Sequence, residues 1–195
     1  MSQKGSAFER YICRKLSHWF SAGQADDWFW RSAGSGARAS VRGKKGKKTE
    51  GHHGDITCTC TEGQWLTDVL TFELKRGYNK FSLFDLLDAP ETAAKQKWTE
   101  WIAQAQESHE QAQRSMSWAI ISRRDRRQEL ITVPYGFVER LESAGSCVGA
   151  CCPSVRACLD LGDDRQQLFC TTLDSWMSYV RTRHILDLLE MMNKP

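Results

Sequence analysis

A strand with one apolar and one polar face is the feature that most constrains this chain. It is expected over residues 66–75 (LTDVLTFELK), where the side chains alternate in character. Successive side chains of a strand point to opposite faces. One face therefore carries Leu70, Phe72 and Leu74, and the other carries Thr71, Glu73 and Lys75. The apolar face can be buried only if this strand joins a sheet that helices cover.

Periodic apolar residues on both sides of this strand predict the remaining elements. Helical spacing predicts helices over residues 4–21, from beyond Pro90 to about Gln113, over 135–143 and over 176–192. Short apolar or alternating runs predict strands over residues 28–30, 55–60, 118–122 and 129–133. Turns are expected at residues 62–64 and 123–127, and the cysteine-containing segment 145–162 is expected to be irregular.

This order of elements predicts an α/β (α+β) fold with a mixed central sheet flanked by helices. The strands at 118–122 and 129–133 would form a hairpin, and the chain would close with a helical extension. A length of 195 residues favours one compact domain. We divide it into a core over residues 1–133, which includes a basic loop at 33–50, and a cysteine-containing extension over residues 134–195.

The chain carries no signal for membrane insertion or secretion. No run approaches the roughly eighteen apolar residues that a transmembrane helix needs. The first ten residues (MSQKGSAFER) carry three charged side chains and no apolar stretch, unlike a secretory signal. We therefore expect a cytoplasmic protein. In that reducing compartment the eight cysteines would be buried thiols or metal ligands and not disulfides.

The cysteines of the extension raise the question of a zinc site. They are Cys147, Cys151, Cys152, Cys158 and Cys170. Zinc modules usually pair cysteines that are separated by two to four residues. Cys147 and Cys151 fit one such pair, but the spacing from Cys152 to Cys158 is wider and no histidine lies nearby, so a structural zinc ion is possible but disfavoured. Cys58 and Cys60, in the strand at 55–60, are interpreted as small apolar residues of the core.

A basic, glycine-rich stretch between Arg31 and Thr49 contains no acidic residue. Its basic residues are Arg31, Arg38, Arg42, Lys44, Lys45, Lys47 and Lys48. Such a loop suits the phosphate backbone of a nucleic acid, because cations that neutralise phosphates release the bound counterions. A solvated loop without a partner is the alternative, since an isolated run of charges is often no more than that.

Asp55, Glu73 and Lys75 form the constellation with the clearest chemical meaning. Glu73 and Lys75 are two residues apart on one strand, so their side chains share a face. Asp55 opens a neighbouring strand and supplies a second carboxylate. Mg²⁺ prefers a few carboxylate oxygens and several waters, and a lysine beside it could orient or deprotonate an attacking water. A solvent-facing ion pair is the alternative for charged residues on a strand.

Four short segments follow one another in a recognisable order: Lys4–Arg10 (KGSAFER), Arg31–Gly36 (RSAGSG), Gly54–Ile56 (GDI) and Glu73–Lys75 (ELK). In this order they resemble archaeal-type Holliday junction resolvases, which belong to the PD-(D/E)xK nuclease superfamily. The resemblance covers about residues 4–78, and Gly54 replaces the usual proline before the motif aspartate. The part beyond Pro90 resembles phage-encoded relatives, in which a Trp-rich helix and a β-hairpin follow the ExK strand.

The resemblance implies a restriction-endonuclease-like fold and a Mg²⁺-dependent DNA endonuclease, in which Mn²⁺ could substitute. Asp55, Glu73 and the backbone carbonyl of Leu74 would bind the metal ion. Glu9 would complete the metal shell, either directly or through a water molecule.

The resemblance also implies roles for residues around the metal site. Lys75 would position or activate the attacking water. In several superfamily members a glutamine on the helix after the ExK strand faces the site. Gln104 is the candidate here, with Gln96 as the alternative, and a plain surface glutamine is the competing interpretation. Ser35, Arg31 and the basic loop would hold the strand that is cut.

Branched DNA is the expected substrate. A homodimer is implied, because a branched or duplex substrate usually needs two cuts. Two alternatives stay open: a phage nuclease that acts on linear or host DNA with the same chemistry, and a nucleic-acid-binding protein that uses the nuclease fold as a scaffold. A phage-encoded enzyme would work in the cytoplasm of the bacterial host, with no membrane partner.

Overall fold

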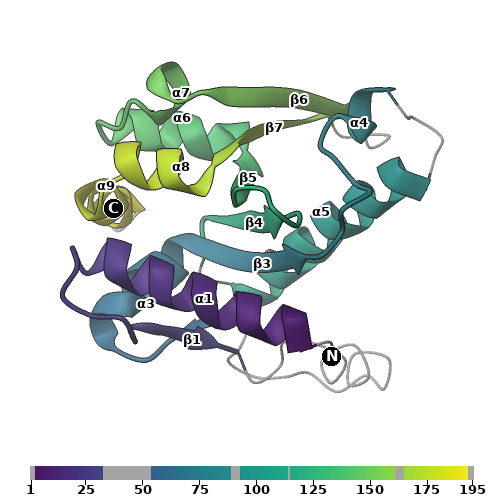
Figure 1. Cartoon of the computed structure of the whole chain (residues 1–195). Helices are drawn as coiled ribbons and strands as arrows, with labels where there is room; N and C mark the ends of the chain where they lie inside the picture. The colour runs from purple at the N-terminus through teal and green to yellow at the C-terminus, as the bar shows by residue number, and fades with distance from the viewer. Residues whose placement is uncertain (1–2, 33–53, 89–92, 114, 161–164, 193–195) are drawn as a thin grey trace.

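A five-stranded mixed sheet forms the centre of the computed structural model (Figure 1). In spatial order its strands are β3 (Leu70–Arg76), β4 (Ser117–Arg123), β5 (Leu130–Pro134), β7 (Arg165–Thr172) and β6 (Ser154–Asp160). The β3–β4 pair is parallel, and the other neighbours are antiparallel. The structure describes residues 3–32, 54–88, 93–113, 115–160 and 165–192. The predicted mixed sheet flanked by helices and the predicted β4–β5 hairpin are confirmed.

Helix α5 (Ala93–Ala112) lies on the connection between the parallel strands β3 and β4, after the short helix α4 (Asp85–Asp88). Parallel neighbours need such a crossover connection, because a tight turn reverses the chain and can join only antiparallel strands. The buried residues of α5 recur at helical spacing: Trp98, Trp101, Ile102 and Ala105. They pack in one cluster with Trp118 and Ile120 of β4 and Leu168 of β7, so α5 covers one face of the sheet.

Helix α1 (Gln3–Phe20) covers the opposite face and runs alongside β3 (Figure 1). Every fourth residue of its inner side is buried: Phe8, Ile12, Leu16 and Phe20. These residues pack with the apolar face predicted for β3. Helices α6 (Tyr135–Ser143), α8 (Leu173–Tyr179) and α9 (Thr182–Met192) add residues to the same cluster. Within the described ranges, no helix combines the length and apolarity that crossing a membrane requires.

A second, two-stranded sheet lies beside the outer edge of β3. It pairs β1 (Phe29–Arg31) with β2 (Ile56–Cys58) in antiparallel fashion. The backbone N–H of Asp55, just before β2, donates to the carbonyl of Phe72 in β3 at 2.7 Å. The small sheet therefore contacts the edge of the large sheet at Asp55, the residue predicted to be a metal ligand.

Residues 61–69 form a helix, α3 (Thr61–Val69), so the predicted turn at 62–64 and the first part of the predicted strand at 66–75 were wrong. Leu66 and Val69 are both fully buried at a spacing of three residues, which is helical. Cys60 was also misassigned to the core, because its half-buried Sγ caps α3 by accepting from the N–H of Gly63 at 3.3 Å. Cys58 is half-buried and packs against the core.

The C-terminal part contains more regular structure than predicted. The segment expected to be irregular holds the short helix α7 (Val148–Cys151) and the whole of strand β6, and the neighbouring β7 was not predicted. β6 is an edge strand with exposed side chains, so it lacks the buried alternation that would have revealed it. The predicted helix at 176–192 is split into α8 and α9, because Val180 adopts an extended conformation. The boundary drawn at residue 133 stays a prediction.

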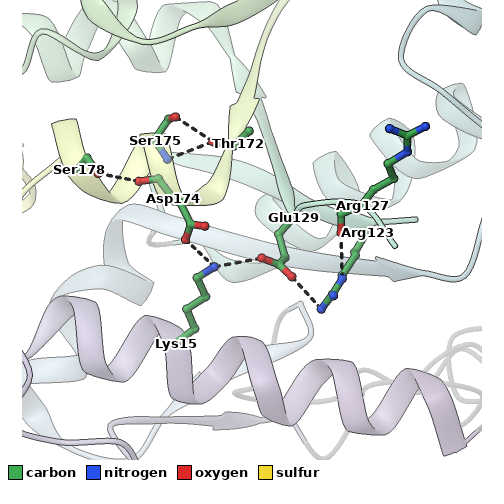
Figure 2. Close-up of polar contacts among 8 residues, drawn as sticks. All are labelled: Lys15, Arg123, Arg127, Glu129, Thr172, Asp174, Ser175 and Ser178. Carbon is green, nitrogen blue, oxygen red and sulfur yellow. Dashed lines mark hydrogen bonds and ion pairs between the residues drawn. The ribbon is translucent and has the colours of Figure 1, made fainter. Parts of the chain in front are cut away.

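A polar network fastens α1 to the end of β4, the start of β5 and helix α8 (Figure 2). The buried Glu129 carboxylate contacts Lys15 Nζ at 3.0 Å and Arg123 Nη1 at 2.9 Å. Lys15 also pairs with Asp174 of α8 at 2.6 Å. Both cations lie 5.8 Å from the centre of the Tyr11 ring on α1. The network therefore fixes the turn end of the β4–β5 hairpin relative to α1.

Glu129→Gln should lower the free energy of unfolding by about 1 to 2 kcal/mol, because Lys15 and Arg123 lose a buried carboxylate partner, while both stay partly exposed and Lys15 keeps its pair with Asp174. Denaturant unfolding of the full chain measures this difference. Glu100→Gln is the control, because its pair with Lys97 is exposed and should change the free energy by at most about 0.5 kcal/mol. Equal effects of the two substitutions would contradict a stabilising role for the network.

Candidate active site at the edge of strand β3

Asp55 is fixed against the edge of β3 by contacts with backbone on both sides. Its N–H donates to the Phe72 carbonyl at 2.7 Å, and its Oδ2 accepts from the N–H of Leu74 at 2.8 Å. Behind it, Ser32 donates from its Oγ to the Gly54 carbonyl at 2.7 Å and from its N–H to the Asp55 carbonyl at 3.0 Å. The carboxylate therefore has a defined position beside the backbone of Leu74.

Gly54 stands where the resembling nucleases usually have proline, and its conformation accounts for the difference. Its φ is +74°, in the left-handed region that glycine adopts most easily. A Cβ at this position would lie 2.6 Å from the carbonyl oxygen of Phe72 and 2.9 Å from the methyl group of Thr71. The proline ring holds φ near −65°, so proline cannot adopt this conformation.

The polar face of β3 meets α5 through hydrogen bonds. Lys75 Nζ donates to Glu73 Oε2 at 3.0 Å and to Gln104 Oε1 at 2.6 Å. Ser108, one turn further along α5, donates to Glu73 Oε1 at 3.0 Å. Glu73 and Lys75 are both buried. Of the two candidate glutamines, the structure brings Gln104 to the site, while Gln96 is exposed about two turns nearer the start of α5.

Sequence reasoning missed Ser108 and a further polar row at the start of β3. There Thr71 Oγ1 and the Oγ of Ser115 lie 2.7 Å apart, and His109 Nδ1 lies 2.7 Å from the same Oγ. Burial lowers the pKa of His109, which favours a neutral imidazole in this row. Gln104 and Ser108 are four residues apart, so they share one face of α5. The four-residue spacing from Gln104 could therefore have predicted that Ser108 also faces the site.

The two carboxylates of the site influence each other strongly. Burial and the neighbouring charge of Glu73 raise the pKa of Asp55 to about 7. The Leu74 N–H and the charge of Lys75 act in the opposite direction without cancelling this effect. The arrangement is therefore unfavourable while both carboxylates are charged and no further cation lies beside them.

The donor set at this edge fits a hard divalent cation. Asp55 and Glu73 supply carboxylate oxygens, and Mg²⁺ usually takes one or two protein carboxylates and keeps several waters. The described residues contain no group of three or more His, Cys, Asp or Glu side chains placed to hold a metal ion. That statement includes the cysteines of the extension, of which Cys147 and Cys151 are exposed free thiols.

Glu9 reaches the site from α1 and is paired with Arg31 of β1. Its Oε2 accepts a hydrogen bond from the Nε of Arg31. The charge of Glu9 contributes to the raised pKa of Asp55, so the two carboxylates are electrostatically coupled. Glu9 was expected to bind the metal ion and Arg31 the nucleic acid, but the two side chains form an ion pair with each other. The other residues predicted to bind nucleic acid lie outside the described ranges: Ser35, Arg38, Arg42, Lys44, Lys45, Lys47 and Lys48.

A mixed sheet with Asp55 at its edge and Glu73 and Lys75 on the adjoining strand has the organisation of a PD-(D/E)xK nuclease. The family model described as "phage putative PDDEXK endonuclease" matches residues 1–187. The chain therefore belongs to this phage endonuclease family, which confirms the predicted superfamily and its phage relationship. Comparisons with curated proteins and with solved structures found no significant match.

Gln104→Ala should lower the rate constant of cleavage about tenfold, because the Lys75 ammonium loses a charge-assisted hydrogen bond that holds it in place. Single-turnover kinetics measure this change. DNA affinity should stay unchanged, and the melting temperature should fall by only a few degrees, because the buried Lys75 keeps its bond to Glu73. Gln96→Ala on the same helix is the matched control and should cleave like the wild type. Equal cleavage rates for the two variants would show that Gln104 does not position Lys75.

Proposed function

We propose that the protein is a metal-dependent endodeoxyribonuclease whose active site lies at the edge of β3. The observation that carries the proposal is the joint geometry of three side chains. Asp55 is held by the amide of Leu74, and Glu73 and Lys75 project side by side from the same face of that strand. The family match over residues 1–187 supports the endonuclease assignment.

Asp55, Glu73 and the carbonyl of Leu74 would hold Mg²⁺, or Mn²⁺ in its place, and Glu9 would complete the shell directly or through water. When bound, the cation would supply charge stabilisation at the phosphate and lower the pKa of a coordinated water. The chain keeps these oxygens in position beforehand: the Leu74 N–H orients Asp55, and Ser108 orients Glu73. Such preorganisation avoids the cost of assembling the site during the reaction.

Lys75 would position the attacking water or offset the charge that develops on the phosphate. An ammonium group has three donors, and two of them are used by Glu73 and Gln104. Among the described residues, no other acceptor takes the third. That donor is available to a water molecule or a phosphate oxygen at the site. Gln104 acts through Lys75 as a positioning residue.

The substrate would be held by cations around this edge. Ser35 and the basic loop with Arg38, Arg42, Lys44, Lys45, Lys47 and Lys48 would contact the phosphates of the strand that is cut. Arg31 would contact the same DNA strand and keep its hydrogen bond to Glu9. We further propose branched DNA as the preferred substrate and a homodimer as the form that makes paired cuts. Linear DNA is the alternative substrate.

Lys75→Ala should abolish cleavage and leave DNA affinity nearly intact, because Lys75 acts on the reacting groups and not on the duplex at large. The assay measures Mg²⁺-dependent cleavage of a four-way junction, a flap and a linear duplex, together with binding to each. Lys80→Ala is the control, since Lys80 is an exposed lysine beyond the end of the strand. Wild-type turnover by Lys75→Ala would remove the catalytic assignment, and preference within the panel would identify the substrate.

Asp55→Asn should weaken Mg²⁺ binding and abolish cleavage, because a neutral amide is a poorer ligand for a hard cation. The amide can keep an oxygen toward the Leu74 N–H, so the fold should be preserved. Isothermal titration calorimetry with Mg²⁺ measures the affinity without DNA. Unchanged affinity in this variant would show that the metal ion binds elsewhere.

A further inference from the structure

A cavity of about 620 Å³ lies beside Lys75, where β3 and β4 end. Its walls come from the segment after β3, from α5, from the β4–β5 turn and from the β6–β7 hairpin. Its size is within the range of pockets that bind small molecules. Because Lys75 is part of the wall, a ligand in this cavity would lie next to the candidate active site.

Aromatic rings form one wall of the cavity. They are Tyr78, Phe81, Phe84, Trp98 and Trp101. The Tyr78 ring meets Trp101 edge-on, with centroids 4.8 Å apart, and Trp98 and Trp101 are 5.1 Å apart. At the rim, Tyr78 is 38% exposed and Phe84 is 56% exposed. Exposed aromatic rings gathered at the mouth of a cavity are typical of ligand-binding surfaces.

Trp98 adds an unused hydrogen-bond donor to this wall. Its side chain is 2% exposed, and its Nε1 has no hydrogen-bond partner among the described residues. A buried indole N–H without an acceptor is costly, so most such groups have a partner. Trp98 lines the cavity, so this N–H belongs to its wall, although the nitrogen atom itself is closed off from solvent.

Arginines of the β4–β5 turn form another wall: Arg123, Arg124, Arg126 and Arg127. The acids near this turn are already engaged, Asp125 by Arg76 at 2.7 Å and Glu129 by Arg123 at 2.9 Å. Within the described ranges, the guanidinium groups of Arg124, Arg126 and Arg127 form no ion pair. In Figure 2 the Arg127 side chain extends away from Glu129, while its carbonyl accepts from Arg123.

We propose that this cavity binds one unpaired nucleotide of the DNA strand, next to the phosphate that is cut. The proposal rests on the proposed nuclease function and adds a substrate class to it: DNA with an unpaired nucleotide at the cutting point, as in branches, flaps and single strands. The base would stack on the exposed rings of Tyr78 and Phe84. The arginines of the turn would bind the flanking phosphates.

Three properties of the cavity together favour a nucleotide over an apolar ligand or a protein segment. Aromatic rings stack on any base, but a base inside a duplex is already stacked on its neighbours and must leave them to reach a ring. The arginines complement phosphate and would stay unpaired beside an apolar ligand. Lys75, which would act on the scissile phosphate, lies in the wall of the same cavity.

The test compares binding of the full-length chain to a short single strand and to a blunt duplex of the same sequence, by fluorescence anisotropy without divalent cations. Tyr78→Ala and Phe84→Ala should each weaken single-strand binding about 5- to 150-fold, the effect of losing one stacked base. Duplex affinity should not change. Tyr78→Phe keeps the ring and should bind like the wild type. Trp65→Ala is the matched control, because Trp65 is equally exposed at 38% and lies on α3, outside the cavity.

A substitution of Arg126 can remove a positive charge from the cavity wall without destabilising the fold. Its φ is +59°, a conformation that glycine adopts more easily than other residues. Arg126→Gly should therefore weaken single-strand binding and reduce the dependence of affinity on salt, without lowering the melting temperature. Unchanged binding in this variant would exclude the turn from the DNA path.

The outcomes separate this proposal from the nuclease function. Single-strand binding unchanged in both Tyr78→Ala and Phe84→Ala would overturn the cavity proposal alone, even if the wild type cleaves DNA with Mg²⁺. An equal loss of single-strand and duplex affinity would also overturn it, because the rings would then belong to a general DNA surface. Failure of the wild type to cleave any DNA with Mg²⁺ would instead contradict the proposed function.

Discussion

The outer edge of β3 has to be closed, and the way in which this chain closes it determines the rest of the site. β3 is the edge strand of the large sheet, and an open edge exposes unpaired backbone groups. Asp55 covers two of them, with its N–H on the Phe72 carbonyl and its carboxylate on the Leu74 N–H. The contact that protects the edge therefore also sets the position of a carboxylate. Gly54 makes this close approach possible, because no Cβ fits against Phe72.

The two faces of β3 have different roles: one packs in the core, and the other carries the candidate active-site residues. The apolar face packs under α1 and anchors the strand in the main core. The polar face is matched residue by residue to α5, with Lys75 on Gln104 and Glu73 on Ser108. Burying a charged pair adds little stability on its own, and the extra hydrogen bonds from α5 compensate the groups that burial removes from water. The proposed catalytic groups are thus held by rigid elements of the fold.

Local patterns predicted the parts of the molecule that depend on local periodicity. The alternation over residues 70–75, the four-residue spacing of α1 and the β4–β5 hairpin were all readable in this way. The helix at 61–69 was not, because Leu66 and Val69 also extend the apolar run that leads into β3. Ser108 and the φ of Gly54 depend on contacts between distant segments. No periodicity in the chain encodes those contacts, although the motif order led to Asp55 and Glu73.

The most direct measurement of the central claim is the position of a bound metal ion. Crystals of the wild-type protein soaked in Mn²⁺ and measured near the manganese absorption edge would locate it by anomalous scattering. The account predicts a peak between the carboxylates of Asp55 and Glu73, within coordination distance of the Leu74 carbonyl. A peak elsewhere on the protein, with none at the edge of β3, would contradict the account.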